Sequence, residues 1–160
     1  MASITGTAKR NSVSRVRQAV SDTDLKAARK IRHEVFVEEQ GIPDAHEQDA
    51  LDDNAVHVIA VDGERVVGTG RLIFKTRATG IIGRIAVDRA HRGAGLATEI
   101  MQALETLARE RGMTAIELLP HDDLERFYTR LGYRTVPGGE FMIGTHRVLT
   151  MTKQLDSGER

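Results

Sequence analysis

The sequence has no cysteine, no excess of charge of either sign and no long apolar run. Without cysteine the chain can form no disulfide, thiolate metal site or cysteine nucleophile, and it suits a reducing compartment. Lys plus Arg (23) equal Asp plus Glu (23), so the net charge does not indicate a nucleic-acid partner. No stretch resembles a membrane span or a signal peptide. We therefore expect a cytoplasmic protein that binds neither nucleic acid nor membrane.

The length of the chain suits a single domain. With 160 residues, 40 % apolar and 29 % charged, the chain can bury one substantial core. We expect a flexible tail at 1–12, one domain at 13–155 and a short tail at 156–160, with no internal repeat. Whether the chain forms a homodimer is left open.

The periodicity of apolar residues predicts both helices and strands. The expected strands are residues 13–20, 56–61, 65–74, 79–87, 114–119, 133–136 and 146–153. The expected helices are 25–40, about 95–111 and 124–131, with caps from the "SDTD" stretch, from Asp122 or Asp123, and from Gly112. The Asp62-Gly63-Glu64 stretch predicts a tight hairpin. This order predicts a mixed α/β or α+β fold, not a regularly alternating parallel sheet.

The stretch "HRGAGLA" (91–97) joins an expected strand, "GRIAV", to an expected long helix. A helix start presents unpaired N–H groups and a partial positive charge, and small residues let an anion approach them. Arg92 adds a planar cation. The stretch can therefore form a phosphate cradle. It can equally be a glycine-rich turn, and it matches neither the P-loop nor the dinucleotide-binding fingerprint.

The spacing of Arg92, Gly95 and Ala97 resembles the Arg/Gln-x-x-Gly-x-Gly/Ala signature of the GNAT N-acyltransferase superfamily. "DLERFYTRLGYRTV" is similar to its Phe-Tyr-x-x-x-Gly-Phe/Tyr segment, and "IRHEVFVEEQGIP" is similar to the ElaA-type branch. The resemblance extends over about residues 13–153. It implies a GNAT-like fold, in which a mixed and mostly antiparallel central sheet is flanked by helices.

The resemblance also implies a cosubstrate, acetyl-CoA or a related acyl-CoA, with no metal. Its pyrophosphate would lie on the backbone amides of the cradle, and its pantetheine arm would pair with strand "RIAV" as an added strand. The Val87 amide would then polarise the thioester carbonyl. The residues implied in cofactor binding are Ile85, Ala86, Val87, Arg92, Gly93, Ala94, Gly95, Leu96, Ala97 and Tyr128.

Tyr128 aligns with the tyrosine that often protonates the leaving thiolate in this superfamily. Its spacing with Leu124, Phe127 and Leu131 alone favours a core residue on an apolar helix face. The resemblance favours a position near the sulfur. Both interpretations leave the phenol in need of a hydrogen-bond partner.

The general base is less well defined, because Arg84 stands where some family members carry a glutamate on the central strand. The sequence offers Glu34, Glu38, Glu39, His57, Glu117 and His121, each of which can also be a solvated surface residue. Glu38 and Glu39 end the helix that borders the acceptor site in the family. His121 follows the end of a strand, where ligand sites of α/β proteins tend to lie. We take Glu38, Glu39 and His121, with Tyr128, as the candidate catalytic residues.

The acidic stretch "DAHEQDALDDNAVH" (44–57) has three interpretations. It can be a solvated loop. It can hold a hard cation through Asp49, Asp52 and Asp53, although it lacks the EF-hand spacing. It can also attract a cationic amine.

These observations predict an N-acyltransferase that moves an acyl group, acetyl first among them, from acyl-CoA to a primary amine of a small molecule or peptide. Two alternatives remain at this point: a non-catalytic acyl-CoA sensor of the same fold, and an enzyme similar to acyl-homoserine lactone synthases, because "VFVEEQ" resembles those too. The latter predicts a basic surface for an acidic carrier protein, which an even charge mixture does not favour.

Overall fold

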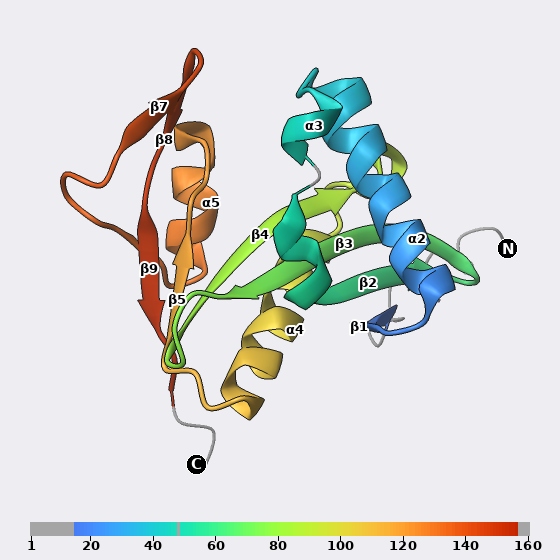
Figure 1. Cartoon of the computed structure of the whole chain (residues 1–160), viewed down its shortest axis with the longest axis horizontal. Helices are drawn as coiled ribbons and strands as arrows, with labels where there is room; N and C mark the ends of the chain where they lie inside the picture. The colour runs from blue at the N-terminus through green and yellow to red at the C-terminus, as the bar shows by residue number, and fades with distance from the viewer. Residues whose placement is uncertain (1–14, 48, 157–160) are drawn as a thin grey trace, which may run out of the picture.

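The computed structural model describes residues 15–47 and 49–156 (Figure 1). The strands are β1 Val16–Ala19, β2 Val56–Asp62, β3 Arg65–Phe74, β4 Thr79–Val87, β5 Ala115–Leu118, β6 Arg134–Thr135, β7 Phe141–Ile143, β8 His146–Val148 and β9 Met151–Gln154. The helices are α2 Asp22–Arg32, α3 Asp44–Glu47, α4 Leu96–Glu110 and α5 Glu125–Arg130. A π-helix, η2 His33–Glu39, continues α2, and three 3₁₀ turns are η3 Ala50–Asn54, η4 Arg89–His91 and η5 Asp122–Leu124.

Seven strands form one sheet in the order β1-β2-β3-β4-β5-β9-β6, and β7 and β8 form a separate hairpin. Among the strands of the described residues, every pair is antiparallel except β4 with β5. The expected mixed, mostly antiparallel sheet is thus confirmed. The parallel pair lies at the centre, so the sheet consists of two antiparallel parts joined by β4 and β5.

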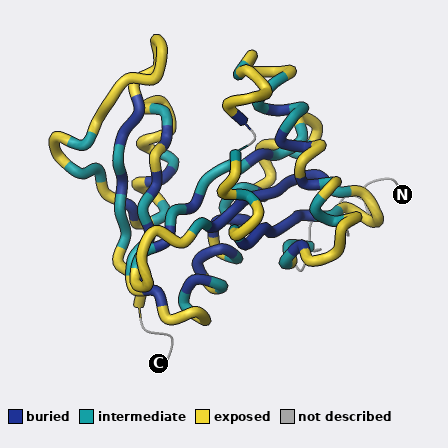
Figure 2. The backbone as a smooth tube through the Cα atoms, viewed as in Figure 1, coloured by how far each residue is buried: buried dark blue, intermediate teal, exposed yellow. Residues whose placement is uncertain are grey.

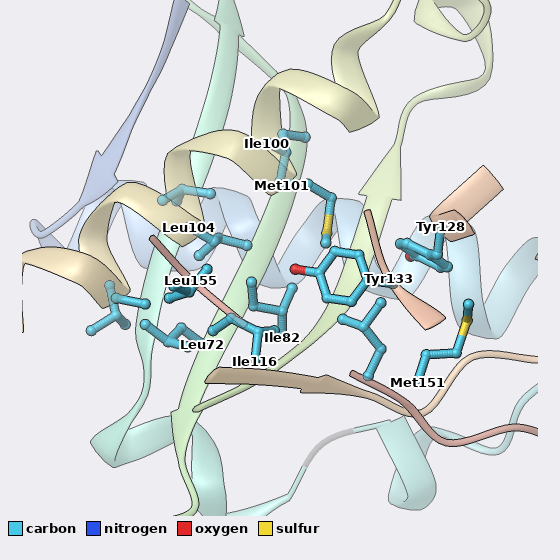
Figure 3. Packing of buried hydrophobic residues seen from close by; sticks show 14 of the residues in the cluster. Leu72, Ile82, Ile100, Met101, Leu104, Ile116, Tyr128, Tyr133, Met151 and Leu155 are labelled. Carbon is cyan, nitrogen blue, oxygen red and sulfur yellow. The ribbon is translucent and has the colours of Figure 1, made fainter. Parts of the chain in front are cut away.

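The two helices that pack on β1–β4 cover opposite faces of the sheet (Figure 1). On α4 the apolar positions recur every four residues, and Leu96, Ile100, Leu104 and Ala108 are all buried against alternate residues of β2. The intervening residue Ile59 faces α2 instead. Each buried Leu or Ile contributes about 1.5–3 kcal/mol relative to exposure, so this seam holds α4 firmly in place. Figures 2 and 3 show the resulting buried layer.

Several predicted boundaries needed correction. The helix expected at 25–40 starts earlier, because Ser21 caps it by accepting from the Asp24 N–H, and its last part is the π-helix η2. The helix expected at 124–131 starts as a 3₁₀ turn, with His121 rather than Asp122 or Asp123 at the cap position. The strand expected at 146–153 is divided into β8 and β9, and β7 lies in the stretch taken for a turn.

Other predictions are confirmed. The β2–β3 hairpin turns at Gly63, whose φ is +66°, and Gly112 ends α4 with a φ of +81°. Strand β4 has the predicted bounds. Of the expected tails, residues 1–12 and 157–160 lie outside the described residues, as do the first residues of the strand expected at 13–20.

Candidate active site

Strand β4 loses its partner on one side halfway along its length. It pairs with β5 only through Thr79–Ile81, opposite Ala115–Glu117. Beyond this point β4 and β5 diverge toward the top of the view in Figure 1. Within the described part of the chain, residues 82–87 therefore pair with β3 alone and present a free strand edge. An edge of this kind can accept an extended ligand as an added strand.

A β-bulge lies at the start of this free edge. Thr69 pairs with Ala86 and Arg71 with Gly83, so Arg84 and Ile85 together face Gly70. Arg84 has a φ of +53°, which is unusual for a residue other than glycine. Gly70 is required here, because a Cβ would lie 2.7 Å from Ile100 Cγ2 and 2.8 Å from Ile85 Cδ1. Bulges bend a strand and turn its groups, and they are common beside active sites.

The backbone N–H and C=O of Val87 point away from β3, toward the free edge. Asp88 N–H donates to the Val67 carbonyl (2.8 Å). In an antiparallel ladder the groups of the preceding residue then point to the other side. In agreement, Arg92 Nε reaches the Val87 carbonyl from that side (2.8 Å). The Val87 N–H is thus aimed at the free edge, as an amide that polarises a carbonyl oxygen would need to be.

The loop after β4 leads to the start of α4. Gly93 and Gly95 both have a φ of +85°, a conformation that glycine adopts without the strain of a side chain. Gly95 is the N-cap residue and provides no side-chain hydrogen bond, and the first helical bond is Glu99 N–H to Gly95 carbonyl (3.1 Å). The N–H groups of 96–98 therefore have no hydrogen-bond partner among the described residues. They form a donor cluster at the positive end of a helix dipole.

A cavity of about 460 Å³ lies between this loop, the end of β4 and α5. Eight predicted cofactor residues line it: Ile85, Val87, Arg92, Gly93, Gly95, Leu96, Ala97 and Tyr128. Ala86 does not, because it points to the other face of the sheet and packs near Ile31 and Val35, and Ala94 is also outside the lining. Four lining residues were not predicted from the sequence: His91, Thr98, Leu124 and Phe127.

Two of the missed residues carried a signal in the sequence. Leu124 and Phe127 share the apolar helix face of Tyr128, and a face that lines a cavity has the same pattern as a face that fills a core. Thr98 extends the donor cluster by one residue. His91 is fixed by the hairpin loop, since its Nε2 lies 3.0 Å from Asp62 Oδ2, and only the folded chain brings these two together.

Tyr128 is buried at 7 % exposure and lines the cavity. Burial raises the pKa of its phenol to about 12, so the group stays protonated at neutral pH. Its hydroxyl makes no hydrogen bond to any part of the chain that the structure describes. A protonated phenol with a free hydroxyl beside a cavity can donate a proton to a ligand there.

The candidate bases are spread over the neighbouring surface. Glu39 Oε1 accepts from Arg92 Nη2 (2.8 Å), and this hydrogen bond lowers the pKa of Glu39. Glu38 is exposed, with Oε2 3.5 Å from His33 Nε2. The ring of His121 stacks on that of His146, with centroids 4.6 Å apart. None of these three side chains lines the cavity.

The remaining candidates have other partners. Glu34 pairs with Lys30 on the helix surface, and Glu117 pairs with Lys75. His57 lies 3.1 Å from the Asp52 carbonyl, and burial lowers its pKa. These contacts place all three away from the cavity lining.

Three carboxylates of the acidic stretch after η2 belong to a largely buried ion network. Its members are Arg32, Glu47, Asp49, Asp52, Arg71 and Arg84. Arg71 Nη1 lies 2.8 Å from Asp49 Oδ1 and 2.7 Å from Asp52 Oδ1, and its hydrogen bond lowers the pKa of Asp49. Three cations balance three anions. The carboxylates of Asp49 and Asp52 thus hold arginines instead of a cation or solvent. The solvated interpretation fails for these two and for Glu47, whereas Asp44 and Asp53 are exposed as it expects.

The geometry fits an extended ligand with a phosphate group at one end. The free edge of β4 offers backbone partners to amides, the donor cluster offers N–H groups to an anion, and Tyr128 brings a protonated hydroxyl to the same cavity. A cavity of this volume is in the usual range for small-molecule sites. In the described residues no group of three or more His, Asp or Glu side chains is arranged to hold a metal ion.

A family model described as "Acetyltransferase (GNAT) family" matches residues 23–133, which include the donor cluster and Tyr128. The chain belongs to the GNAT acetyltransferase family. A Bacillus subtilis member named "Uncharacterized N-acetyltransferase YjcF" is 38 % identical over 124 residues, which are 78 % of this chain and 88 % of that protein. The resemblance seen in the sequence is confirmed.

Solved structures of the same fold agree with this membership. A Lactobacillus plantarum GNAT-like structure, named "putative N-acetyltransferase", is 30 % identical, with a TM-score of 0.82 over 88 % of this chain and 97 % of that one. Escherichia coli ElaA has a TM-score of 0.75 over 86 % of this chain and 97 % of its own, at 22 % identity. At that identity the likeness to ElaA concerns the fold. No described helix of this GNAT chain is long and apolar enough to cross a membrane.

Proposed function

We propose that this GNAT protein transfers an acyl group, acetyl first among them, from acyl-CoA to a primary amine of a small molecule or peptide. The observation that supports the proposal most is the unpaired edge of β4, residues 82–87, which leads directly to the donor cluster at the start of α4. One continuous backbone surface thus offers partners for amides at one end and for phosphate at the other.

In this proposal each part of the surface has one task. The pyrophosphate lies on the N–H groups of 96–98, with Arg92 as a neighbouring cation, and the pantetheine arm follows the free edge of β4. The space beside Gly93 and Gly95 is open to the ligand, because no atom of the protein lies within 4 Å of where a Cβ would stand at either position. The Val87 N–H donates to the thioester carbonyl oxygen and stabilises negative charge as it develops.

The reaction is a direct acyl transfer. The amine nitrogen attacks the thioester carbon, the C–N bond forms and the C–S bond breaks. The electron pair of the C–S bond leaves with sulfur, which takes a proton from the Tyr128 hydroxyl. The amine gives up a proton to a base or to water, and Tyr128 regains a proton from solvent. The products are an amide and CoA with a free thiol.

The base is proposed among Glu38 and His121, with water as the alternative route. Glu39 is the weakest of the three candidates. Its carboxylate already accepts a hydrogen bond from Arg92, and this bond lowers its pKa, so it accepts a proton less readily. The acidic stretch gives no support for an acceptor that arrives as a cation. Asp49 and Asp52 are bound to arginines and do not offer free negative charge to a cationic amine.

The test is a turnover screen of the purified chain with acetyl-CoA and longer acyl-CoAs against a panel of primary amines, with release of free thiol as the signal. The proposal predicts thiol release that depends on the amine, and mass spectrometry should find the amide. Tyr128→Phe provides the matched protein control. Binding of acyl-CoA without amine-dependent thiol release across the panel would favour a sensor.

A further inference from the structure

Glu39 sits where the acceptor side of the molecule meets the phosphate loop. It is the last residue of η2, whereas Arg92 belongs to the loop that lines the cavity. These two residues are 53 positions apart in the sequence, yet Arg92 Nη2 donates to Glu39 Oε1 at 2.8 Å. Arg89 Nη2 lies 3.6 Å from the other carboxylate oxygen.

Arg92 is held from two directions. Its Nε donates to the Val87 carbonyl at the end of β4, and its Nη2 donates to Glu39. A guanidinium has five N–H groups, so these bonds leave three for another ligand. The Glu39 side chain is 22 % exposed, whereas that of Arg92 is 42 % exposed. The carboxylate therefore fixes the plane of a guanidinium that the Val87 carbonyl alone would hold by a single hydrogen bond.

We propose that Glu39 is a positioning residue that orients Arg92 for the phosphate groups of acyl-CoA, and not the general base. This inference rests on the function proposed above. The Arg92 hydrogen bond lowers the pKa of Glu39, which makes the carboxylate a weak proton acceptor and a lasting partner for the guanidinium. A long side chain ordered before the ligand arrives loses less conformational freedom on binding.

The backbone around Glu39 suits a positioning role. Glu39 ends a π-helix, a rare element that is often found at functional sites. Gln40 N–H donates to the Val35 carbonyl (3.2 Å), and Gly41 N–H to the Val37 carbonyl (3.1 Å), so the end of η2 is closed by backbone bonds. A carboxylate on such an end has a defined position relative to the loop of Arg92.

The experiment compares Glu39→Gln with Glu39→Ala. Both remove the negative charge, but only the glutamine keeps an oxygen that can accept from Arg92. Calorimetric titration with CoA gives the Kd of each variant, in the native background and in the Arg92→Met background, which has no donor. Glu34→Ala removes a carboxylate from the same π-helix and serves as the control. Circular dichroism melting shows whether every variant is folded.

We expect Glu39→Ala to bind CoA about two- to tenfold more weakly than Glu39→Gln, the order expected for ordering one long side chain. In the Arg92→Met background this difference should disappear. Once an acceptor is known, the loss should fall in the KM for acetyl-CoA and the acidic limb of the pH–rate profile should not move.

Three results would overturn the inference while the proposed function stands. Equal Kd values for the two variants in the native background would mean that the hydrogen bond does not orient Arg92. A difference that persists with Arg92→Met would assign the effect to another contact. A kcat loss in Glu39→Gln with unchanged Kd would make Glu39 the base. If the unsubstituted protein itself binds no CoA, the proposed function fails, and this inference fails with it.

Discussion

The Tyr128 ring lies edge-on against the Tyr133 ring, with centroids 6.2 Å apart (Figure 3). Only one of the two hydroxyls is used within the described structure. Tyr133 donates to Glu105 Oε2 at 2.7 Å, and Lys153 Nζ also contacts that carboxylate. The Tyr128 hydroxyl has no such partner and belongs to the cavity wall. Two neighbouring phenols thus have separate tasks, one in the core and one facing the site.

Tyr128→Phe should lower kcat by about 10²–10⁴-fold, because the ring remains and only the proton donor is lost. The Kd for CoA should change little. Tyr133→Phe is the matched control: it should lower the free energy of unfolding by about 1–3 kcal/mol, since it leaves Glu105 with one partner fewer. A Tyr128→Phe variant within twofold of the parent would assign this residue to the core.

Alkaline pH should lower the free energy of unfolding, because the buried phenol of Tyr128 is held in its neutral form. Its pKa is about 12 in the folded state and 10.0 for the unburied group, so above pH 10 the unfolded chain releases a proton that the folded chain retains. The stability associated with the neutral phenol is complete below pH 10 and is lost as the pH rises toward 12. At pH 11 the loss should be about 1 kcal/mol. Urea titrations at pH 8 and pH 11 should show a smaller fall in the free energy of unfolding for Tyr128→Phe than for the parent. An equal fall in both proteins would contradict the raised pKa of Tyr128.

Gly95 and Gly112 offer a matched pair at the two ends of α4. Their φ angles are +85° and +81°, and a Cβ at either position meets no atom within 4 Å. Alanine should therefore destabilise both by a similar amount, about 1–2 kcal/mol. Only Gly95 lines the cavity, so Gly95→Ala should weaken CoA binding at least about tenfold beyond Gly112→Ala, a loss typical of misplacing backbone donors. Equal Kd values for CoA in the two variants would mean that the donor cluster does not bind CoA.

Arg32 should be among the most sensitive positions for stability. Its side chain is 1 % exposed and pairs with Glu47 and Asp52. Arg32→Met removes one of the two arginines that neutralise each of these buried carboxylates, leaves two cations for three anions, and should cost about 3–5 kcal/mol. Arg17→Met breaks a pair with Asp24 whose arginine is 54 % exposed, and it should have little effect. Urea titration at pH 7 compares the two, and similar midpoints would contradict a structural role for the network.

The sequence predicted the parts of the site that depend on local patterns. Strand β4, the helix start at Gly95 and the Phe127-Tyr128 pair follow from periodicity and spacing, and the superfamily resemblance joined them into one site. Among the lining residues that were missed, Leu124 and Phe127 share the predicted apolar helix face of Tyr128, whereas other relationships depend on folding. His91 needs Asp62 from a distant hairpin, and the role of Glu39 needs Arg92, 53 residues away.

The acidic stretch illustrates the same limit for charges. Asp49 and Asp52 look like solvated or ligand-binding residues, because nothing in their neighbourhood in the sequence balances them. Their partners Arg32 and Arg71 come from α2 and β3. The π-helix η2 was also missed, because its 7 residues are too few to show an apolar period different from that of the α-helix it continues.

Amide hydrogen exchange with and without acetyl-CoA is the most direct test of the central claim, that the cosubstrate lies along the free edge of β4. We expect slower exchange at Val87 and at 96–98 on saturation, with no change in β1, the outer strand at the far side of the sheet. Unchanged exchange at Val87 and 96–98, with protection elsewhere at saturating acetyl-CoA, would contradict it.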